Sequence, residues 1–255
     1  MICQTLSLQK TDHIIVIEIA ECFEDQAKAV RQNSEMVKLC EEIACDKELR
    51  AVVVTSEGKK FLSFGTDLSE PGSLNYWEPG FASWAEPISK FAQPVIAAIQ
   101  GDAIGQGLEL ALACDIRIAT ETSCFGLPYI EEGLIPWDGG TQRLPRLIGR
   151  ARAMEMILTG KMIDAQEAYR IGLINRIVPP DKLMTVAMDM AKEIASKGPI
   201  ALRYAKEAIY KGMDMTLEQG LRLEADLYLL IHSTKDRTEG IKAFQEKRTP
   251  KFEGK

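Results

Sequence analysis

The segment from Val95 to Asp115 constrains the fold more than any other, because it combines a buried strand, a glycine-rich turn and a helix in direct succession. Five apolar residues in a row, 95–99, follow a proline and are soon followed by a glycine, which is typical of a short buried strand. Three glycines between residues 101 and 107 then allow the backbone to turn sharply and to approach a ligand closely. A helix is expected to begin near Gln106. Strands that lead into helices in this way are typical of α/β folds.

The first turn of that helix combines an anion-stabilising donor with a carboxylate. The first amides of a helix have no partner inside the helix, and the helix dipole favours an anion in front of them. Side chains lean toward the helix N-terminus, so Glu109 can reach the space in front of the Gln106 amide. This pairing suits the formation of an enolate. The alternative is that Glu109 only complements the helix dipole, and the glycine spacing fits neither a dinucleotide fingerprint nor a phosphate loop.

Composition favours one substantial domain, with room for a small helical appendage. The 255 residues are 46% hydrophobic and carry a net charge of −6, which predicts no general attraction to nucleic acid or membrane. No apolar run reaches the about 20 residues that cross a bilayer, and the N-terminus shows no basic-then-apolar leader. We therefore expect a cytoplasmic protein.

The metal-ligating residue types are sparse and scattered. Six cysteines include no Cys-x-x-Cys pair, so free thiols are expected rather than disulfides or a metal site. The two histidines, His13 and His232, have no motif around them, and both are interpreted as structural. No zinc constellation and no serine nucleophile elbow can be assembled.

Strands and helices alternate in the first two thirds of the chain, which predicts right-handed crossovers and a mainly parallel sheet. Strands are expected at 13–20, 51–55, 95–99 and 116–119, and a first helix over 26–45. After Asn175 we expect helices only, over 181–196, 200–210, 216–231 and 235–246. The predicted division is an α/β core over residues 1–175 and a helical C-terminal region over 176–255.

Further segments strengthen the case for chemistry, and their order is specific. They are Lys60–Ser69 after the strand at 51–55, Phe125–Gly149, Ala153–Gly160 and Ala165–Val178. Together with the segment from Val95 to Asp115 they resemble the enoyl-CoA hydratase/isomerase, or crotonase, superfamily over roughly residues 50–255. The N-terminal 45 residues match poorly, since Ala20–Lys28 stands where the family usually has a proline-x-x-x-asparagine stretch. The resemblance implies a β-β-α spiral and a C-terminal helical region that builds trimers, often paired into hexamers.

The resemblance also implies roles for residues near the thioester. It places an oxyanion hole at the backbone amides of Thr66 and Gln106, and the first of two family glutamates at Glu109. The second family glutamate falls on Tyr129, so Asp138 is the nearest replacement for it. Two alternatives stay open: Asp138 is an N-cap of the helix that begins near Gly139, or Tyr129 orients substrate or water through its hydroxyl.

Coenzyme A is implied as part of the substrate, so no separate cofactor is expected. The positions implied to bind it are Phe64, Asp67, Leu68, Tyr228, Phe244 and Lys247. For Lys247 the alternative to CoA binding is that it simply belongs to a solvated, basic helix end. An aromatic cluster at Tyr76, Trp77, Phe81 and Trp84 either lines an acyl pocket for a cyclic or short substrate or only packs.

The predicted function is hydration of a 2-enoyl-CoA, with a cyclic or dienoyl acyl group as one option, in fatty acid or aromatic acid metabolism. Glu109 is the expected general base, assisted by Asp138 or Tyr129. The alternatives are an enoyl-CoA double-bond isomerase, which needs a single carboxylate, and a non-catalytic CoA-binding or scaffold protein.

Overall fold

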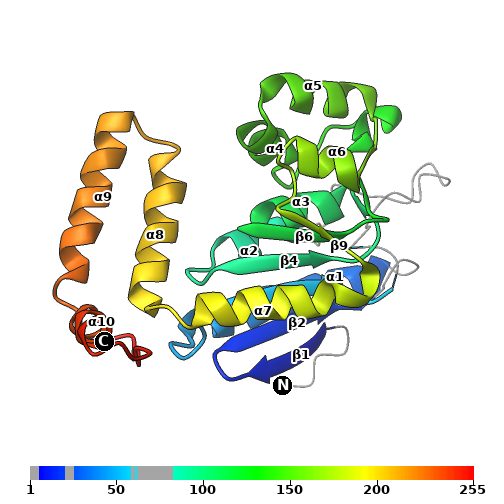
Figure 1. Cartoon of the computed structure of the whole chain (residues 1–255). Coiled ribbons are helices and arrows are strands. Elements are labelled where there is room, and N and C mark those ends of the chain that lie inside the picture. Colours follow the sequence, from blue (N-terminus) through cyan, green and yellow to red (C-terminus); the bar gives the residue numbers. More distant parts are fainter. Residues whose placement is uncertain (1–5, 21–25, 59–60, 62–82) are drawn as a thin grey trace.

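A six-stranded sheet forms the centre of the molecule (Figure 1). The computed structural model describes residues 6–20, 26–58, 61 and 83–255. The strand order is β1-β2-β3-β4-β6-β9, and every pair is parallel except the β1–β2 hairpin. The strands are β1 (Leu6–Thr11), β2 (Ile14–Ile19), β3 (Ala51–Ser56), β4 (Val95–Ile99), β6 (Ile116–Thr120) and β9 (Arg176–Val178).

Both faces of the sheet are covered, which explains why β3 and β4 are buried throughout and mostly apolar. Alternate strand residues point to opposite faces, so Val53 and Ile96 pack on one side and Val52 and Val95 on the other. On the first side lies α7 (Leu183–Ala195), which meets the sheet through four apolar residues spaced four apart, Leu183, Ala187, Ala191 and Ala195. On the second side lie α1 (Gln26–Cys45), α2 (Ala85–Ser89) and α3 (Gln106–Ala113).

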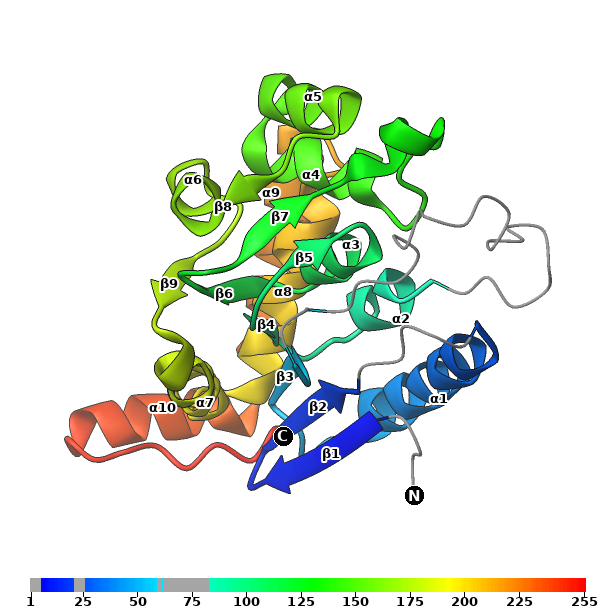
Figure 2. The ribbon, with the colours of Figure 1, turned by 90° about the vertical axis from the view of Figure 1, so that its right-hand side faces the viewer.

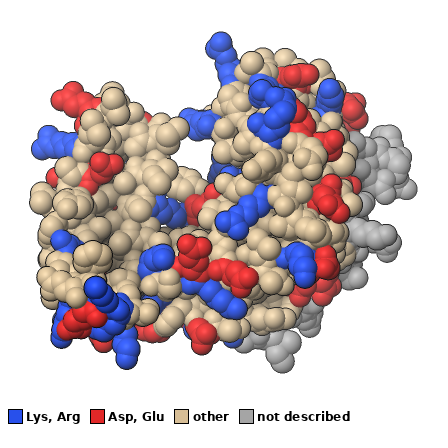
Figure 3. Space-filling view, in the orientation of Figure 1, with Lys and Arg blue, Asp and Glu red and all other residues tan. Residues whose placement is uncertain are grey.

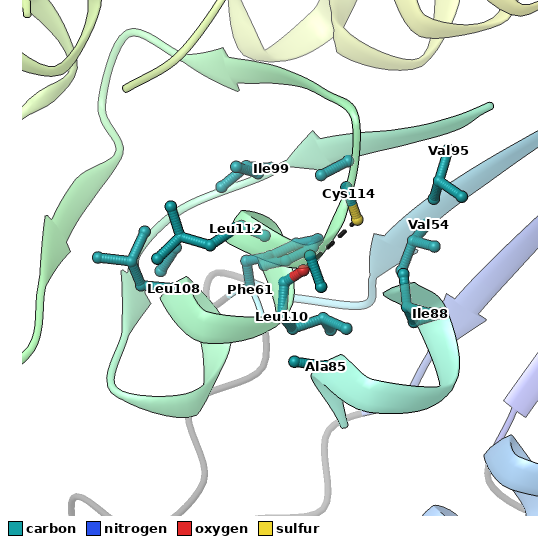
Figure 4. Close-up of a cluster of buried hydrophobic side chains, with 14 of the residues drawn as sticks. Val54, Phe61, Ala85, Ile88, Val95, Ile99, Leu108, Leu110, Leu112 and Cys114 are labelled. Atoms are coloured by element: carbon teal, nitrogen blue, oxygen red, sulfur yellow. Dashed lines mark hydrogen bonds between the residues drawn. The ribbon is translucent and has the colours of Figure 1, made fainter. Parts of the chain in front are cut away.

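Helix α3 is buried along its whole length (Figure 4). Leu108 and Leu112 pack in one apolar cluster with Ile99 of β4 and Ile88 of α2. At the end of α3, the thiol of Cys114 donates a 3.5 Å hydrogen bond to a carbonyl oxygen inside the helix. Because every side of α3 is packed, the polar residues of its first turn are held inside the protein.

A second, three-stranded sheet lies next to the first (Figure 2). It contains β5 (Ala103–Ile104), β7 (Cys124–Gly126) and β8 (Ile163–Asp164), in the order β5-β7-β8. The surrounding helices are the 3₁₀ helix η1 (Pro128–Glu132), α4 (Gly140–Ile148), α5 (Arg150–Thr159) and α6 (Ala165–Arg170). The loop between η1 and α4 passes over the first turn of α3.

The last helices form an arm that stands beside the core in Figure 1. After η2 (Pro180–Lys182) and α7, the arm contains α8 (Pro199–Gly212), α9 (Leu217–Ile231) and α10 (Lys235–Gln245). Thr216 and Gln219 form a capping box at the start of α9. Figure 3 shows that the molecule is hollowed between the arm and the core. Many apolar side chains of the arm are exposed: Ile209, Met213, Leu217, Leu221, Tyr228, Leu229, Leu230 and Phe244.

The expected alternation of strands and helices is confirmed. The expectation of helices only after Asn175 is wrong. Residues Arg176–Val178 form strand β9, which pairs with β6 at the edge of the large sheet. A strand of three residues is too short to show a period in the sequence. Strand β9 and α7 thus contribute to the sheet and its cover, and the division at residue 175 stays a prediction.

Candidate active site

The carboxylate of Glu109 is fully buried in the first turn of α3. Its Oε1 accepts hydrogen bonds from the backbone N–H groups of Asp138 and Gly140, each at 2.8 Å. Its Oε2 accepts a 2.7 Å hydrogen bond from the hydroxyl of Tyr129. Gly140 is the first residue of α4, so Glu109 lies at the positive end of a second helix. These donors make it possible to bury the carboxylate.

Burial raises the pKa of the Glu109 carboxyl above its ordinary value, and the hydrogen bonds that it accepts offset that rise only in part. A general base is most effective when its pKa lies near the working pH. A raised pKa would suit a general base, and the catalytic role of Glu109 stays a prediction.

Tyr129 reaches Glu109 from η1, directly after the second sheet. Its side chain is buried, and its hydroxyl is the donor to Oε2. The position that the family resemblance gave to a second glutamate thus holds a phenol that contacts the first glutamate. The alternative in which Tyr129 orients substrate or water through its hydroxyl stays a prediction.

The carboxylate of Asp138 binds the N-terminus of α2. Its Oδ2 accepts the backbone N–H groups of Trp84 and Ala85 at 2.8 and 3.0 Å, and its Oδ1 accepts a short hydrogen bond from the hydroxyl of Ser83. The alternative in which Asp138 caps the next helix is wrong, because α4 begins after Gly139 with no side-chain cap. Asp138 is instead a cap for a helix more than fifty residues earlier, which local sequence cannot show.

Two glycines allow the loop of Asp138 to lie against Glu109. Gly139 has a φ of +105°, a region that favours glycine. A Cβ on Gly140 would lie 3.0 Å from Oε1 of Glu109 and 2.8 Å from the side chain of Pro136. Any larger residue at position 140 would push the carboxylate or the loop aside.

The amide of Gln106 begins α3, as the sequence predicted. Gly105 before it has a φ of +57°, and its own N–H donates to the carbonyl of Gly126 in β7 at 2.9 Å. Gln106 is buried, and as the first residue of the helix its N–H has no partner within α3. The Gln106 amide and the buried carboxylate of Glu109 therefore belong to the same helical turn, and the role of the amide in an oxyanion hole stays a prediction.

Comparison with known proteins assigns the family. The model of the enoyl-CoA hydratase/isomerase family matches residues 10–255. The chain belongs to this family. The match includes most of the N-terminal segment, which lacks the expected motif. The predicted superfamily, the fold and an enzyme of the hydratase/isomerase type are confirmed.

Individual members of the enoyl-CoA hydratase/isomerase family are similar over most of the chain. Methylglutaconyl-CoA hydratase of Mus musculus is 38% identical over 250 residues, covering 94% of this chain and 80% of that protein. The 2,3-dehydroadipyl-CoA hydratase of Escherichia coli (strain K12) is 39% identical over 227 residues, covering 87% and 88%. The crystal structure of an enoyl-CoA hydratase from Bacillus anthracis superposes with a TM-score of 0.91 at 40% identity, covering 99% and 100%.

The other predicted site residues of this family member lie either outside the described residues or on and after the C-terminal helices. Thr66, Phe64, Asp67 and Leu68 lie outside the described residues, as does most of the aromatic cluster. Tyr228 on α9 and Phe244 on α10 are 61% and 84% exposed, and Figure 1 shows both helices well apart from α3. Lys247 follows α10. The roles of all these residues in binding CoA stay predictions.

The part of the chain that the structure describes offers no cluster of three or more histidine, cysteine or acidic residues that could hold a metal. Cys40, Cys45, Cys114 and Cys124 are free thiols. His13 hydrogen-bonds the carbonyl of Glu48, and His232 packs edge-on against Tyr228. Among the described helices, none is long and apolar enough to cross a membrane.

Two residues that support the site were missed by the sequence analysis. Ser83 lies 55 positions before Asp138, and no local pattern connects them. Arg143 donates a 2.9 Å hydrogen bond to the backbone oxygen of Asp138. The sequence could have predicted this contact, because side chains in the first turn of a helix lean back toward the preceding loop.

Proposed function

We propose that the protein adds water to the double bond of a 2-enoyl-CoA thioester, with Glu109 as the general base. The observation that carries this proposal is the buried Glu109 carboxylate, which lies in the same helical turn as the Gln106 amide. The names of the relatives from mouse and Escherichia coli, both hydratases of acyl-CoA thioesters, support the same reaction.

The proposed reaction uses both features of that turn. Glu109 takes a proton from water as the water oxygen bonds to C3, and the electron pair of the double bond moves to the thioester oxygen. The amide of Gln106, with that of Thr66 as the second proposed donor, stabilises the resulting enolate. One such donor typically supplies about 3 kcal/mol of transition-state stabilisation. The enolate then collapses, and C2 receives the proton that Glu109 holds.

Tyr129 is proposed to align this proton transfer. Its hydroxyl donates a 2.7 Å hydrogen bond to Oε2 of Glu109. In that arrangement Oε1 is held by the loop and Oε2 is the atom that exchanges the proton. The phenol thereby takes a positioning role where the family commonly has a second carboxylate.

Double-bond isomerisation is the second candidate, and the contacts of Asp138 favour it. Moving a double bond from C3 to C2 needs one carboxylate that removes a proton from C2 and returns it to C4. Both carboxylate oxygens of Asp138 are bound to the segment that begins α2. Glu109 is then the single acid/base among the residues assigned to this site.

Further properties are part of the same proposal. The substrate is an acyl-CoA thioester with no additional cofactor, and the protein acts in the cytoplasm. The protein forms a homotrimer or a pair of trimers, a state supported by the exposed apolar side chains of α8, α9 and α10.

Purified protein should be incubated separately with crotonyl-CoA, a 3-enoyl-CoA and a cyclic dienoyl-CoA. Hydration removes the absorbance of the conjugated thioester, whereas isomerisation of the 3-enoyl substrate creates it. We expect loss of absorbance with a 2-enoyl substrate and no loss with Glu109→Gln. Gain with the 3-enoyl substrate alone would assign the isomerase, and CoA binding without turnover would support a scaffold.

A further inference from the structure

Asp138 connects three parts of the site, and all of its polar groups are engaged. Its N–H donates to Oε1 of Glu109 at 2.8 Å, and its backbone oxygen accepts from Arg143 at 2.9 Å. Its two carboxylate oxygens accept hydrogen bonds from the hydroxyl of Ser83 and from the N–H groups of Trp84, just before α2, and Ala85, its first residue. The residue is only 6% exposed. Both carboxylate oxygens therefore face the residues that begin α2.

The cap on α2 is shared between two side chains. The hydroxyl of Ser83 donates to Oδ1 of Asp138 and accepts the backbone N–H of Glu86 at 2.8 Å. Asp138 thus joins the start of α2 to Glu109, since its side chain binds the former and its N–H the latter. Helix α3, which carries Glu109, packs in turn on α2 through Ala85 and Ile88.

We propose that Asp138 is a positioning residue, whose carboxylate anchors the loop of residues 136–140 to α2 and thereby fixes the N–H groups that hold Oε1 of Glu109. The proposal rests on the proposed function in taking Glu109 as the base. With Oε1 held, the base turns Oε2 alone toward Tyr129 and the substrate. Burial raises the pKa of the Asp138 carboxyl, as expected for a group inside the protein rather than in an open pocket.

Asparagine can reproduce these contacts. Its Oδ1 can accept the two backbone N–H groups of α2, and its Nδ2 can donate to the hydroxyl of Ser83. A carboxylate that exchanges protons with substrate cannot be replaced in this way. Alanine removes the anchor entirely, and misplacing a catalytic group by about 1 Å can lower the rate about 100-fold.

The test compares Asp138→Asn and Asp138→Ala with the wild-type protein, using whichever enoyl-CoA the wild type converts. We expect Asp138→Asn to keep at least about a third of kcat, and Asp138→Ala to lose about 100-fold in kcat with a KM within about 3-fold. Ser83→Ala should lower kcat in the same sense but less. Ser89→Ala is the matched control, because Ser89 lies at the other end of α2 and its hydroxyl donates to the carbonyl of Glu86, its only partner among the described residues.

Hydrogen–deuterium exchange gives a readout that does not depend on turnover. Asp138→Ala should accelerate exchange both in residues 83–89 and in residues 136–140, whereas Asp138→Asn and Ser89→Ala should do neither. A fall of 100-fold or more in Asp138→Asn, with exchange unchanged, would assign the carboxylate to the chemistry. Wild-type exchange at 136–140 in Asp138→Ala would also overturn the proposal. If the wild type converts no enoyl-CoA, the proposed function is refuted. Hydrogen–deuterium exchange then tests by itself whether Asp138 anchors the loop.

Discussion

The hydroxyl of Tyr129 donates a 2.7 Å hydrogen bond to Oε2 of Glu109, so both oxygens of the buried carboxylate are held by donors. A glutamate at position 129 would place a second negative charge beside the first, and each charge would disfavour the other. Tyrosine instead stabilises the ionised form of Glu109. Oε2 thus contacts the side chain of Tyr129, whereas Oε1 is anchored by backbone N–H groups of the loop before α4 and of its first residue.

Removing this hydroxyl should move the pH dependence of catalysis upward. The hydrogen bond from Tyr129 lowers the pKa of Glu109 against the rise that burial causes, so Tyr129→Phe raises that pKa further. Glu109 must be ionised to act as a base, and the acidic limb of the kcat/KM profile should therefore shift to higher pH. Profiles of wild type and variant with the same substrate provide the measurement. A shift to lower pH would contradict the assignment of Glu109 as the base.

Glu109→Gln should retain the fold and the affinity for CoA and lose at least about 100-fold in turnover, a usual effect for one general acid/base. The amide oxygen can still accept the two backbone N–H groups, so the loop of residues 136–140 keeps its anchor. Circular dichroism and steady-state rates test both parts. Near-normal turnover would remove Glu109 from the mechanism.

The same variant should be more stable than the wild type at neutral and alkaline pH. The folded-state pKa of Glu109 lies above its ordinary value, so the folded protein binds that proton more tightly than the unfolded chain. The contribution of this group to stability is complete below the unfolded pKa of about 4.3, and it is lost as the pH rises through the folded pKa. Calorimetry should show a higher Tm for Glu109→Gln near pH 8 and a difference that shrinks toward pH 4. A Tm of Glu109→Gln below that of the wild type at all pH values would contradict the predicted direction of the pKa shift.

Lys206 should be important for the junction between the arm and the core. Its ammonium group, on α8, lies 2.7 Å from Oδ2 of Asp115 and 2.9 Å from the carbonyl of Gln93, and the side chains of the pair are 11% and 17% exposed. Lys206→Met leaves the partly buried charge of Asp115 without its ion-pair partner, and for a buried pair such a loss typically costs about 3 kcal/mol. Chemical denaturation measures the loss. Lys211→Met is the matched control, because its pair with Glu207 is exposed and should contribute less than about 1 kcal/mol.

The exposed apolar face of the arm predicts self-association. Leu217 is 80% exposed and Phe244 84%, and such side chains are normally covered when they gather on one region. Light scattering should show a trimer or a hexamer at micromolar concentration. A stable monomer under those conditions would contradict the proposed assembly.

Local sequence determined the elements whose pattern is complete within a few residues. The helix over 26–45 and the strand over 95–99 have the predicted bounds, because apolar spacing, proline and glycine define them without distant contacts. The start of α3 at Gln106, which places Glu109 in its first turn, follows from the glycines before it. The edge strand β1 was not predicted, because its polar residues show a pattern only beside β2.

Only the tertiary structure decided what the side chains of the site contact. The sequence by itself determined that Glu109 lies in the first turn of a helix and that Tyr129 and Asp138 follow it. It could not show that the Tyr129 hydroxyl binds that carboxylate, or that Asp138 caps α2 rather than α4. The physical reason is range: a helix or a turn depends on neighbours a few residues away, whereas these hydrogen bonds join residues 20 to 55 positions apart. Such pairs meet only after the sheet and its covering helices have packed.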